Sequence, residues 1–332
     1  MNRIKVIELF AGIGSQAMAL RNIGVDYEVI GISEIDKFAC KSYEAIHGKT
    51  FNFGDIAKID ELPYCDLLTY SFPCQDLSVA GKQKGISKGT RSGLLLEVER
   101  LLLKARENGT LPKFLLLENV KNLVGKKFIG DFEKWLSFLN SLGYYSNWEV
   151  LNAKDYGIPQ NRERVFVISS LKNIHYEFPR PVELKLKMKD LLEENVNGKY
   201  YLSERHLKYF ADTKNRNGFV RAERFNPRKL EDCSTAFAIT TRAGCRPTDN
   251  FIIQKGKDCM IRKLTPLECW RIMGFSDDDF DRCRTAGISD TQLYKQAGNS
   301  IVLTVLESIF RNLFLKKHKK KRGIVAEQIK MF

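Results

Sequence analysis

A cysteine in the first quarter of the chain stands where a nucleophile would be well placed. Cys74 closely follows an apolar run, Leu67 to Ser71, that has the composition of a buried strand. Ligands of open α/β sheets bind at the carboxyl ends of strands. Pro73 fixes its own φ and favours extended geometry for Phe72, so stiff backbone presents the thiol. We interpret Cys74 as a candidate nucleophile; the alternative is a small buried thiol.

A carboxylate and two arginines follow later in the chain. Glu118 ends a second apolar run, Phe114 to Glu118, where loss of water would raise its pKa and let it hold a proton. Arg162 and Arg164 lead into a further strand-like run, and alternate residues of an extended chain point the same way. One arginine could therefore reach a base or a carboxylate. The alternatives are a loop-bonding glutamate and a surface ladder of ion pairs.

The first predicted strand, Lys5 to Phe10, runs into a glycine-rich turn and then a helix. Gly12 and Gly14 allow a tight turn that a ligand can approach closely. Glu34 lies 20 residues beyond Gly14, at the end of the second predicted strand, where a carboxylate can accept hydrogen bonds from ribose hydroxyls. Asp55 follows a third element and could meet an adenine amino group. An NAD-binding oxidoreductase or an ordinary strand-to-helix turn would share this pattern.

The chain is strongly basic. Its 332 residues include 54 Lys and Arg against 40 Asp and Glu, and the net charge of +14 favours a polyanionic partner, nucleic acid first. The segment 79–93 is rich in glycine and lysine, which suits a loop that closes over a phosphate backbone. Its candidate DNA contacts are Lys82, Gln83, Lys84 and Arg91. The basic run 316–322 is interpreted as a solvated tail.

The elements that must position these residues can be read from the pattern of apolar side chains. Short apolar runs alternate with helix-like segments from residue 5 to residue 170, as in a parallel sheet with helices on both faces. Further strands are predicted over Tyr27 to Ser33, Ser146 to Leu151 and Arg164 to Ser169, and helices over Gln16 to Asn22, Lys37 to Ile46, Gly93 to Glu107 and Asp131 to Leu142. The segment 171–261 lacks this regularity, which indicates a second domain. A capping box at Thr265 and Glu268 starts a helix, and 301–315 predicts a last one.

The eight cysteines include no Cys-x-x-Cys pair and no nearby histidine at a metal-ligand spacing, so no metal site is predicted. Nothing in the sequence resembles a signal peptide or a membrane-spanning run of about 18 apolar residues. The chain is therefore expected to be soluble and cytoplasmic, with reduced thiols and no membrane partner.

Five short motifs resemble, in order and spacing, those of the DNA cytosine-5 methyltransferases of bacterial and phage restriction-modification systems. They are Phe10 to Gly14, Pro73 to Gln75, Glu118 to Val120, Gln160 to Arg164 and Gln296 to Ser300. The resemblance covers residues 3–170 and 262–312, and the block between is where this family keeps its variable target-recognition domain. It implies an α/β fold with a doubly wound, mixed and mostly parallel sheet. The expected parts are a catalytic and cofactor-binding domain (1–170), a small target-recognition domain (171–290), and a C-terminal helix that returns to the catalytic domain with a basic tail (291–332).

The resemblance also implies a cofactor, S-adenosylmethionine, and a reaction. The residues implied to line the cofactor site are Phe10, Gly12, Gly14, Glu34, Asp55, Ile56, Pro73, Leu94, Asn299 and Ser300. Those implied to hold a cytosine flipped out of the duplex are Cys74, Glu118, Arg162 and Arg164. The thiolate would add to C6 while Glu118 binds N3 and the exocyclic amine, which makes C5 nucleophilic enough to take the methyl group.

The implied partner is double-stranded DNA, with a cognate restriction endonuclease acting separately and the chain itself a monomer. Arg242 and Arg246 are predicted guanine readers within the recognition block, with phosphate contact as the alternative. Similarity of the catalytic half to CpG methyltransferases of wall-less bacteria favours a CG-containing target.

Three rival functions leave residues unexplained. A tRNA cytosine-5 methyltransferase would typically carry Pro-Pro-Cys-Gln, whereas this chain has Phe72 before Pro73. An NAD-dependent oxidoreductase accounts neither for Pro73-Cys74 nor for the last motif. A non-catalytic DNA-binding module would not need Cys74 and Glu118 intact.

Overall fold

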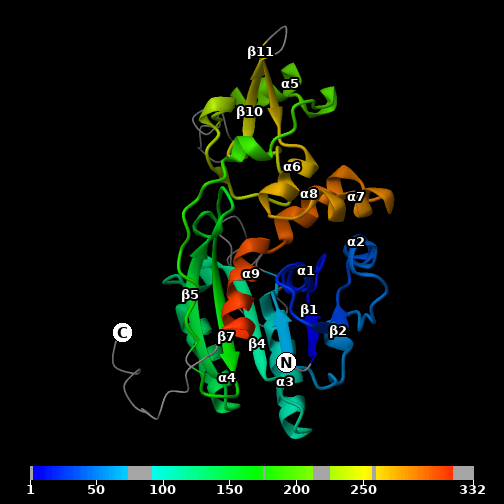
Figure 1. The fold of residues 1–332 in the computed structure, drawn as a ribbon, viewed down its shortest axis with the longest axis vertical. Coiled ribbons are helices and arrows are strands. Elements are labelled where there is room, and N and C mark those ends of the chain that lie inside the picture. The colour runs from blue at the N-terminus through cyan, green and yellow to red at the C-terminus, as the bar shows by residue number, and fades with distance from the viewer. Residues whose placement is uncertain (1–2, 74–91, 175, 212–224, 256–258, 317–332) are drawn as a thin grey trace.

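A six-stranded sheet lies at the centre of the larger part of the molecule (Figure 1). The computed structural model describes residues 3–73, 92–174, 176–211, 225–255 and 259–316. In the order β2-β1-β3-β4-β7-β5, the sheet contains β1 (Ile4–Leu9), β2 (Tyr27–Ser33), β3 (Leu67–Tyr70), β4 (Phe114–Val120), β5 (Tyr145–Asn152) and β7 (Glu163–Ser170). All six strand predictions are confirmed, and no end differs by more than two residues.

One strand of this sheet runs against the others. β1, β2, β3 and β4 are parallel neighbours, whereas β7 pairs antiparallel with β4 on one side and with β5 on the other. The sheet is therefore mixed and mostly parallel, as the resemblance implied; the alternation of elements by itself predicted a parallel sheet. The reversal has a consequence for the site, because the amino end of β7 lies at the edge where β1 to β4 have their carboxyl ends.

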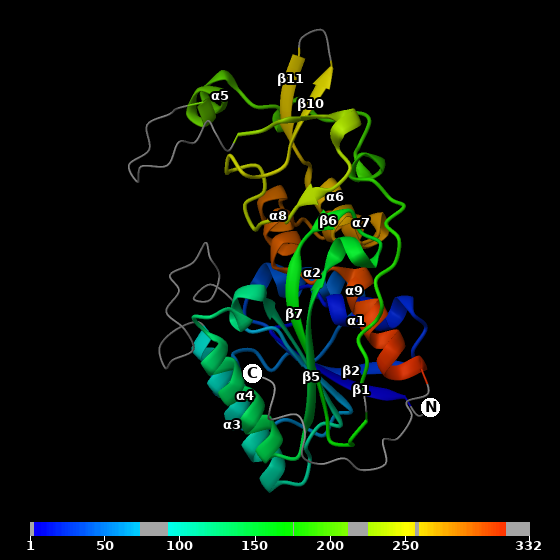
Figure 2. The same ribbon diagram turned by 90° about the vertical axis from the view of Figure 1, so that its left-hand side faces the viewer.

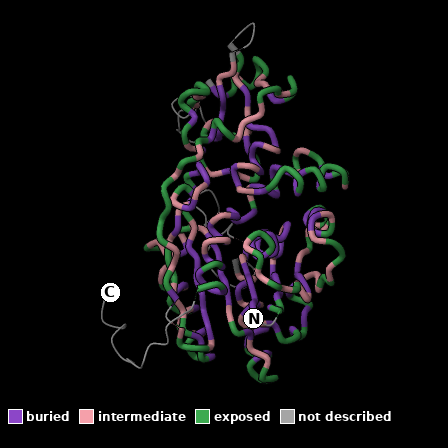
Figure 3. Tube along the Cα trace, in the orientation of Figure 1, coloured by how far each residue is buried: buried purple, intermediate pink, exposed green. Residues whose placement is uncertain are grey.

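Helices cover both faces of the sheet (Figure 2). One face shares a hydrophobic core with α3 (Leu95–Glu107) and α4 (Ile129–Ser141). The other face packs against α1 (Ser15–Asn22) and α9 (Leu303–Phe310), so the C-terminal helix returns to the sheet. The buried residues follow the strands and the inner sides of these helices (Figure 3). The fold is thus a doubly wound α/β fold.

The predicted helices are confirmed with small differences at their ends. A 3₁₀ turn (Ser92–Leu94) precedes α3, and α9 starts two residues later than predicted and continues as a π-helical turn (Arg311–Leu315). The remaining predicted helix is α2 (Lys37–His47). In the described part of the chain, no helix combines the length and the apolar character that crossing a membrane requires.

The smaller part of the molecule stands beyond the carboxyl edge of the large sheet (Figure 1). It holds a sheet of β8 (Arg228–Lys229), β10 (Phe251–Lys255) and β11 (Cys259–Lys263), together with α5 (Glu204–Ala211). A two-stranded ladder of β6 (Gln160–Asn161) and β9 (Ala236–Phe237) joins it to the segment before β7. Between the two parts lie α6 (Pro266–Ile272), α7 (Asp277–Thr285) and α8 (Asp290–Asn299), whose buried side chains belong to the same core as α1 and α9.

The start of α6 combines a local capping motif with a tertiary ion pair. Glu268 N donates to Thr265 Oγ1 at 3.1 Å and the Glu268 carboxylate accepts from Thr265 N at 2.8 Å, so the predicted capping box is confirmed. The same carboxylate is fully buried and accepts two hydrogen bonds of 2.8 Å from Arg262 on β11. A buried charge pair is tolerated only with such complete bonding. The pair fixes the β10–β11 hairpin to α6.

Candidate functional site

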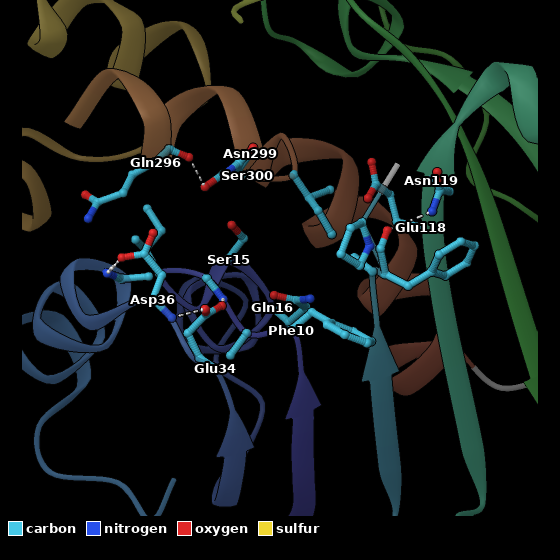
Figure 4. A pocket seen from close by; sticks show the side chains of 18 of the residues that line it. Phe10, Ser15, Gln16, Glu34, Asp36, Glu118, Asn119, Gln296, Asn299 and Ser300 are labelled. Carbon is cyan, nitrogen blue, oxygen red and sulfur yellow. Dashed lines mark hydrogen bonds between the residues drawn. The ribbon is translucent and has the colours of Figure 1, made fainter. Parts of the chain in front are cut away.

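A cavity of about 380 Å³ opens at the edge of the large sheet where β1 to β4 end (Figure 4). This volume is in the range of small-molecule sites. Figure 4 shows Glu34 and Asp36 on one side of the cavity, Glu118 and Asn119 on the other, and the end of α8 above them. The walls therefore come from segments far apart in the chain that the sheet brings to one edge.

Most of the predicted site residues meet in this one cavity. Those that line it are Phe10, Gly12, Glu34, Asp55, Ile56, Pro73, Leu94, Glu118, Arg162, Arg164, Asn299 and Ser300. Cys74 lies outside the described residues, as do Lys82, Gln83, Lys84 and Arg91. Gly14 is described but does not line the cavity.

The turn after β1 is held by the carboxylate of Glu34. One oxygen of Glu34 accepts from Gly12 N at 2.9 Å, and the other accepts from Ile35 N at 2.9 Å and Asp36 N at 2.8 Å. Gly12 has a φ of +57°, a conformation that L side chains rarely adopt. Each carboxylate oxygen has two lone pairs, so Glu34 can still accept hydrogen bonds from a ligand hydroxyl.

Gly14 serves the packing beneath this turn. It is the N-cap residue of α1, with a φ of +79°, and a Cβ built on it would lie 2.4 Å from His47 Nε2 and 2.6 Å from a ring carbon of Tyr43. His47 Nε2 donates to Ile13 O at 3.0 Å. The glycine therefore lets α2 approach the start of α1, which differs from the role in lining the cofactor site that the resemblance implied for it.

A buried acid that sequence reasoning missed lies under the same turn. The Glu8 side chain is fully buried in β1; its carboxylate accepts from Ala17 N at 2.9 Å and from the Tyr43 hydroxyl at 2.6 Å. Burial raises the pKa of Glu8 to about 7, against the lowering effect of these two hydrogen bonds. Its position inside an apolar strand was the available signal, because a carboxylate is rarely buried without partners.

On the far side of the cavity, Glu118 ends β4 and pairs with Arg164 of β7. Arg164 Nε lies 3.2 Å from Glu118 Oε1. Arg164 is opposite Val120 in the β4–β7 ladder, so it reaches Glu118 on the same face of the sheet. Burial raises the pKa of Glu118, while the charges of Arg164 and Arg162 and a hydrogen bond with Ser71 lower it. The net shift is upward, as the sequence predicted.

Asn119 ties the strand beside it to the segment that precedes Cys74. Its Nδ2 donates to Phe72 O at 3.0 Å, and its Oδ1 accepts from Val120 N at 2.9 Å. The Asn119 side chain is buried, and both its amide nitrogen and its amide oxygen bond to backbone groups. Asn119 therefore fixes the backbone at Phe72, next to Pro73 in the cavity wall.

The two arginines of the Gln160 to Arg164 motif differ in their bonds. Both line the cavity, but Arg162 Nη1 donates to Ile239 O at 2.8 Å, and its Nη2 donates to Gly298 O and Ser300 O at 3.0 Å each. Arg162 lies between β6 and β7, and both arginines face the cavity and carry charges that act on Glu118. Arg162 thus joins backbone segments as well as lining the cavity, where its charge acts on Glu118.

The end of α8 forms the remaining wall of the cavity. Lys295 pairs with Asp36, the N-cap residue of α2, at 2.5 Å. Gln296 Nε2 donates to Phe38 O at 3.1 Å and to Ser42 Oγ at 2.8 Å, which fastens α8 to α2. These contacts were not foreseen for Lys295, since they depend on the packing of helices about 260 residues apart.

Chemically, the cavity has two unlike ends. Near β1 and β2 it offers apolar surface from Phe10, Ile35 and Ile56 beside the acceptors Glu34 and Asp55, which suits a ring that carries hydroxyl and amino groups. Near β4 and β7 it offers the buried carboxyl of Glu118, whose pKa is raised, next to the guanidinium of Arg164. The predicted DNA readers Arg242 and Arg246 are exposed in the turn that follows β9.

Comparisons with known proteins give a consistent result. The sequence profile described as C-5 cytosine-specific DNA methylase matches residues 4–315. The chain is 38% identical to the type II methyltransferase M2.ScrFI of Lactococcus lactis subsp. cremoris, with 94% of this chain and 99% of that protein covered. It is 33% identical to the orphan methyltransferase M.SPBetaI of Bacillus phage SPbeta, with 94% and 98% covered.

Solved structures agree in fold. The Entamoeba histolytica methyltransferase EhMeth superposes with a TM-score of 0.78 at 21% identity, covering 96% of this chain and 100% of that one. The Dnmt2 methyltransferase of S. pombe gives a TM-score of 0.75 at 22% identity, covering 94% and 98%. At these identities the likeness concerns the fold alone.

Proposed function

Because this chain belongs to the C-5 cytosine-specific DNA methylase family, we propose that its cavity holds S-adenosylmethionine together with a cytosine flipped out of double-stranded DNA. The protein is a DNA (cytosine-5-)-methyltransferase. In the proposed reaction Cys74 is the nucleophile that adds to C6 of the ring. The main support is that one cavity has an end suited to bind a nucleoside and another end where the Glu118 carboxyl lies beside the Arg164 guanidinium.

The residues at the end of the cavity near β1 and β2 are of the types that would bind S-adenosylmethionine. When bound, the cofactor supplies a methyl group attached to a sulfonium, which is reactive because the neutral thioether left behind is a good leaving group. Glu34 and Asp55 would accept hydrogen bonds from its hydroxyl and amino groups, and Phe10 and Ile56 would pack on its ring. Asn299 and Ser300 would close the site from the end of α8. Glu34 is already oriented by three backbone N–H groups, so little reordering is needed.

The second end would hold and activate the cytosine. A protonated Glu118 can donate to N3 and accept from the exocyclic amine with its other oxygen, and its raised pKa supports the protonated form. Arg164 orients this carboxyl. The Cys74 thiolate would add to C6, and C5 would take the methyl group as the methyl–sulfur bond breaks and S-adenosylhomocysteine is released. Transfer of the C5 proton to water and elimination of the thiolate from C6 would then restore the ring.

The DNA would lie across the opening of the cavity, with the smaller part of the molecule reading its sequence. The excess of positive charge supports this placement. We also propose a restriction-modification context, since the Lactococcus relative is named a type II methyltransferase; a cognate endonuclease would act separately on the same sequence. The enzyme is proposed to work as a monomer.

The test uses the full chain and DNA that carries 5-fluorocytosine. Bisulfite sequencing of DNA from cells that express the chain first identifies the methylated site. On a duplex with 5-fluorocytosine at that site, the methyl group adds but fluorine cannot leave as a proton does, so the enzyme stays attached. We expect a denaturation-resistant complex only when S-adenosylmethionine is present, with the adduct mapped to Cys74.

The matched variant is Cys74→Ala. It should abolish methyl transfer and the covalent complex while S-adenosylmethionine and duplex binding persist. An adduct on another cysteine, or near wild-type methylation by the variant, would overturn the proposed mechanism.

A further inference from the structure

Three distant segments of the chain meet at one junction beside the cavity. We define the junction as residues 160–162, 236–241 and 298–300. The first segment leads into β7 of the large sheet, the second includes β9 of the smaller part, and the third ends α8 and lines the cavity. The junction therefore touches the large sheet, the smaller part and the cavity wall at once.

The first two segments are joined by backbone and side-chain bonds. β6 and β9 pair in parallel, with Gln160 opposite Ala236. The fully buried Gln160 side chain donates to Ile272 O at 2.8 Å and accepts from Ile239 N at 3.0 Å. A buried amide bonded in this way favours one arrangement of the two segments.

Arg162 joins all three segments. Its Nη1 donates to Ile239 O at 2.8 Å, and its Nη2 donates to Gly298 O and Ser300 O at 3.0 Å each. The side chain is 5% exposed, so these bonds are shielded from water. A guanidinium presents several N–H donors in a rigid planar fork and can bond several acceptors at once, whereas a lysine ammonium lacks this fixed geometry.

The third segment also packs directly on the second. A Cβ built on Gly298 would lie 2.3 Å from Thr241 N and 2.6 Å from Thr241 Cα, so the two backbones touch with no side chain between them. Immediately beyond Thr241 comes the turn with the exposed Arg242 and Arg246, and the buried Asp249 carboxylate accepts from Arg246 N at 3.0 Å. The proposed DNA-reading turn and the cavity wall thus share one contact.

We propose that Arg162 is a positioning residue that couples DNA recognition to cofactor binding, an inference that rests on the proposed function. DNA that binds the turn after Thr241 restrains segment 236–241, and through Arg162 and Gly298 it restrains segment 298–300. A ligand in the cavity contacts the same wall. Each ligand favours the arrangement in which Arg162 joins the three segments, so whichever ligand binds second finds that arrangement already favoured and binds more tightly. DNA should therefore tighten cofactor binding by the same factor by which the cofactor tightens DNA binding, because coupling between two binding equilibria is reciprocal.

The experiment measures binding of S-adenosylhomocysteine, the demethylated cofactor, to the full chain by calorimetry. Each protein is titrated alone and in the presence of a saturating duplex that carries the methylated site. We expect the duplex to tighten binding by about 5-fold or more in the wild type, in the range usual for coupled sites. In Arg162→Lys, which keeps the charge near Glu118 but loses the fork, the ratio should fall below about 2-fold.

A matched control is Arg228→Lys. Arg228 also donates to a backbone carbonyl, Thr235 O at 2.6 Å, and to Asn250 Oδ1 at 2.8 Å, and its guanidinium lies 4.9 Å from the centroid of the Phe237 ring, but none of these contacts reaches segment 298–300. This variant should couple like the wild type. Gly298→Ala is a second test, since it forces a Cβ between the two backbones while Arg162 stays intact; its ratio should also fall below about 2-fold.

Thermal unfolding identifies which variants fold. If Arg162→Lys does not fold, the coupling measured in Gly298→Ala decides the test. Wild-type coupling in a folded Arg162→Lys or Gly298→Ala overturns the inference. So does a wild-type protein whose cofactor affinity ignores the duplex, or an Arg228→Lys that loses coupling as well. A wild type that binds no S-adenosylhomocysteine at all would instead refute the proposed cofactor.

Discussion

At the scale of single residues, the turn after β1 rests on two buried titratable groups with opposite tendencies. Burial raises the pKa of Glu8 from 4.5 to about 7. Burial lowers the pKa of His47 from 6.5 to about 4, because its ring is enclosed between Ile13 and Tyr43. Each group is most compatible with the fold in its neutral form. The stability of this region should therefore depend on pH from both sides.

Glu8→Gln should flatten the alkaline limb of this dependence. The folded protein binds the Glu8 proton more tightly than the unfolded chain, so this stabilisation is complete below pH 4.5 and is lost as pH rises towards 7. The loss is on the order of 3 kcal/mol at most. The His47 contribution rises with pH over much of the same range, so the test is the unfolding free energy of wild type minus that of Glu8→Gln in urea, which should fall by up to this amount between about pH 5 and 8. A variant that keeps the full wild-type slope would contradict the buried carboxyl's role; Glu28→Gln, an exposed change on β2, is the control.

The acid limb belongs to His47 and has the opposite sign. The contribution of the neutral His47 ring to folding stability is complete above pH 6.5. It is lost as pH falls from 6.5 towards 4, because His47 in the unfolded chain is protonated at a higher pH than in the folded protein. The two limbs together place the greatest stability of this region in weakly acidic solution. Glu8→Gln should leave the His47 limb in place, which separates the two causes.

At the scale of elements, the two glycines in the turn between β1 and α1 have different roles. Both Gly12 and Gly14 have a positive φ. Nothing lies within 4 Å of a Cβ built on Gly12, whereas a Cβ on Gly14 meets His47 and Tyr43 of α2. The first glycine keeps the cavity side of the turn open, and the second lets α2 pack.

Gly14→Ala should therefore destabilise the protein more than Gly12→Ala. Both variants strain the backbone by roughly 1–2 kcal/mol, but only Gly14→Ala adds overpacking, typically 1–3 kcal/mol more. Urea midpoints at constant pH measure the difference. The order should reverse for cofactor affinity, because Gly12 lines the cavity and Gly14 does not. Equal midpoints for the two variants would mean that α2 shifts easily and that the close approach is unimportant.

At the scale of the whole molecule, one hydrophobic core continues from the large sheet into the smaller part. It includes residues of α1, α9, α6, α7 and α8 together with Cys233, Ala236 and Ile239 of the smaller part. The two parts are therefore packed against each other rather than merely linked, and the turn that carries Arg242 and Arg246 is held at a set distance from the cavity. DNA binding can then be divided into a charge-driven component and a sequence-reading component.

Arg242→Ala and Arg246→Ala should weaken binding of the methylated-site duplex while leaving binding of an unrelated duplex unchanged. A bidentate arginine–guanine contact contributes roughly 1–3 kcal/mol of discrimination. The dependence of affinity on salt, measured by fluorescence anisotropy between 50 and 200 mM salt, should keep its wild-type slope. Equal losses on both duplexes with a shallower slope would instead assign these two arginines to phosphate.

The sequence by itself determined which elements form, their order and the residue types at the sheet edge. Apolar periodicity, glycine turns and the capping box at Thr265 act over a few residues, so they can be read without knowing the fold. The ordered motifs identified the family, and most of the described site residues predicted from the sequence line one cavity in the structure. The same reasoning could not tell whether Gly14 faces a ligand or a helix, because that depends on the position of His47.

Only the tertiary structure decided the contacts between distant segments. The reversal of β7 puts Arg164 beside Glu118, and helix packing buries Glu8 under the turn it supports. Arg162 lies two residues from Arg164, yet its guanidinium goes to carbonyls 77 and 136 residues away. Such choices depend on which buried acceptors lack a partner after the chain has folded, a non-local condition that no local pattern of residues encodes.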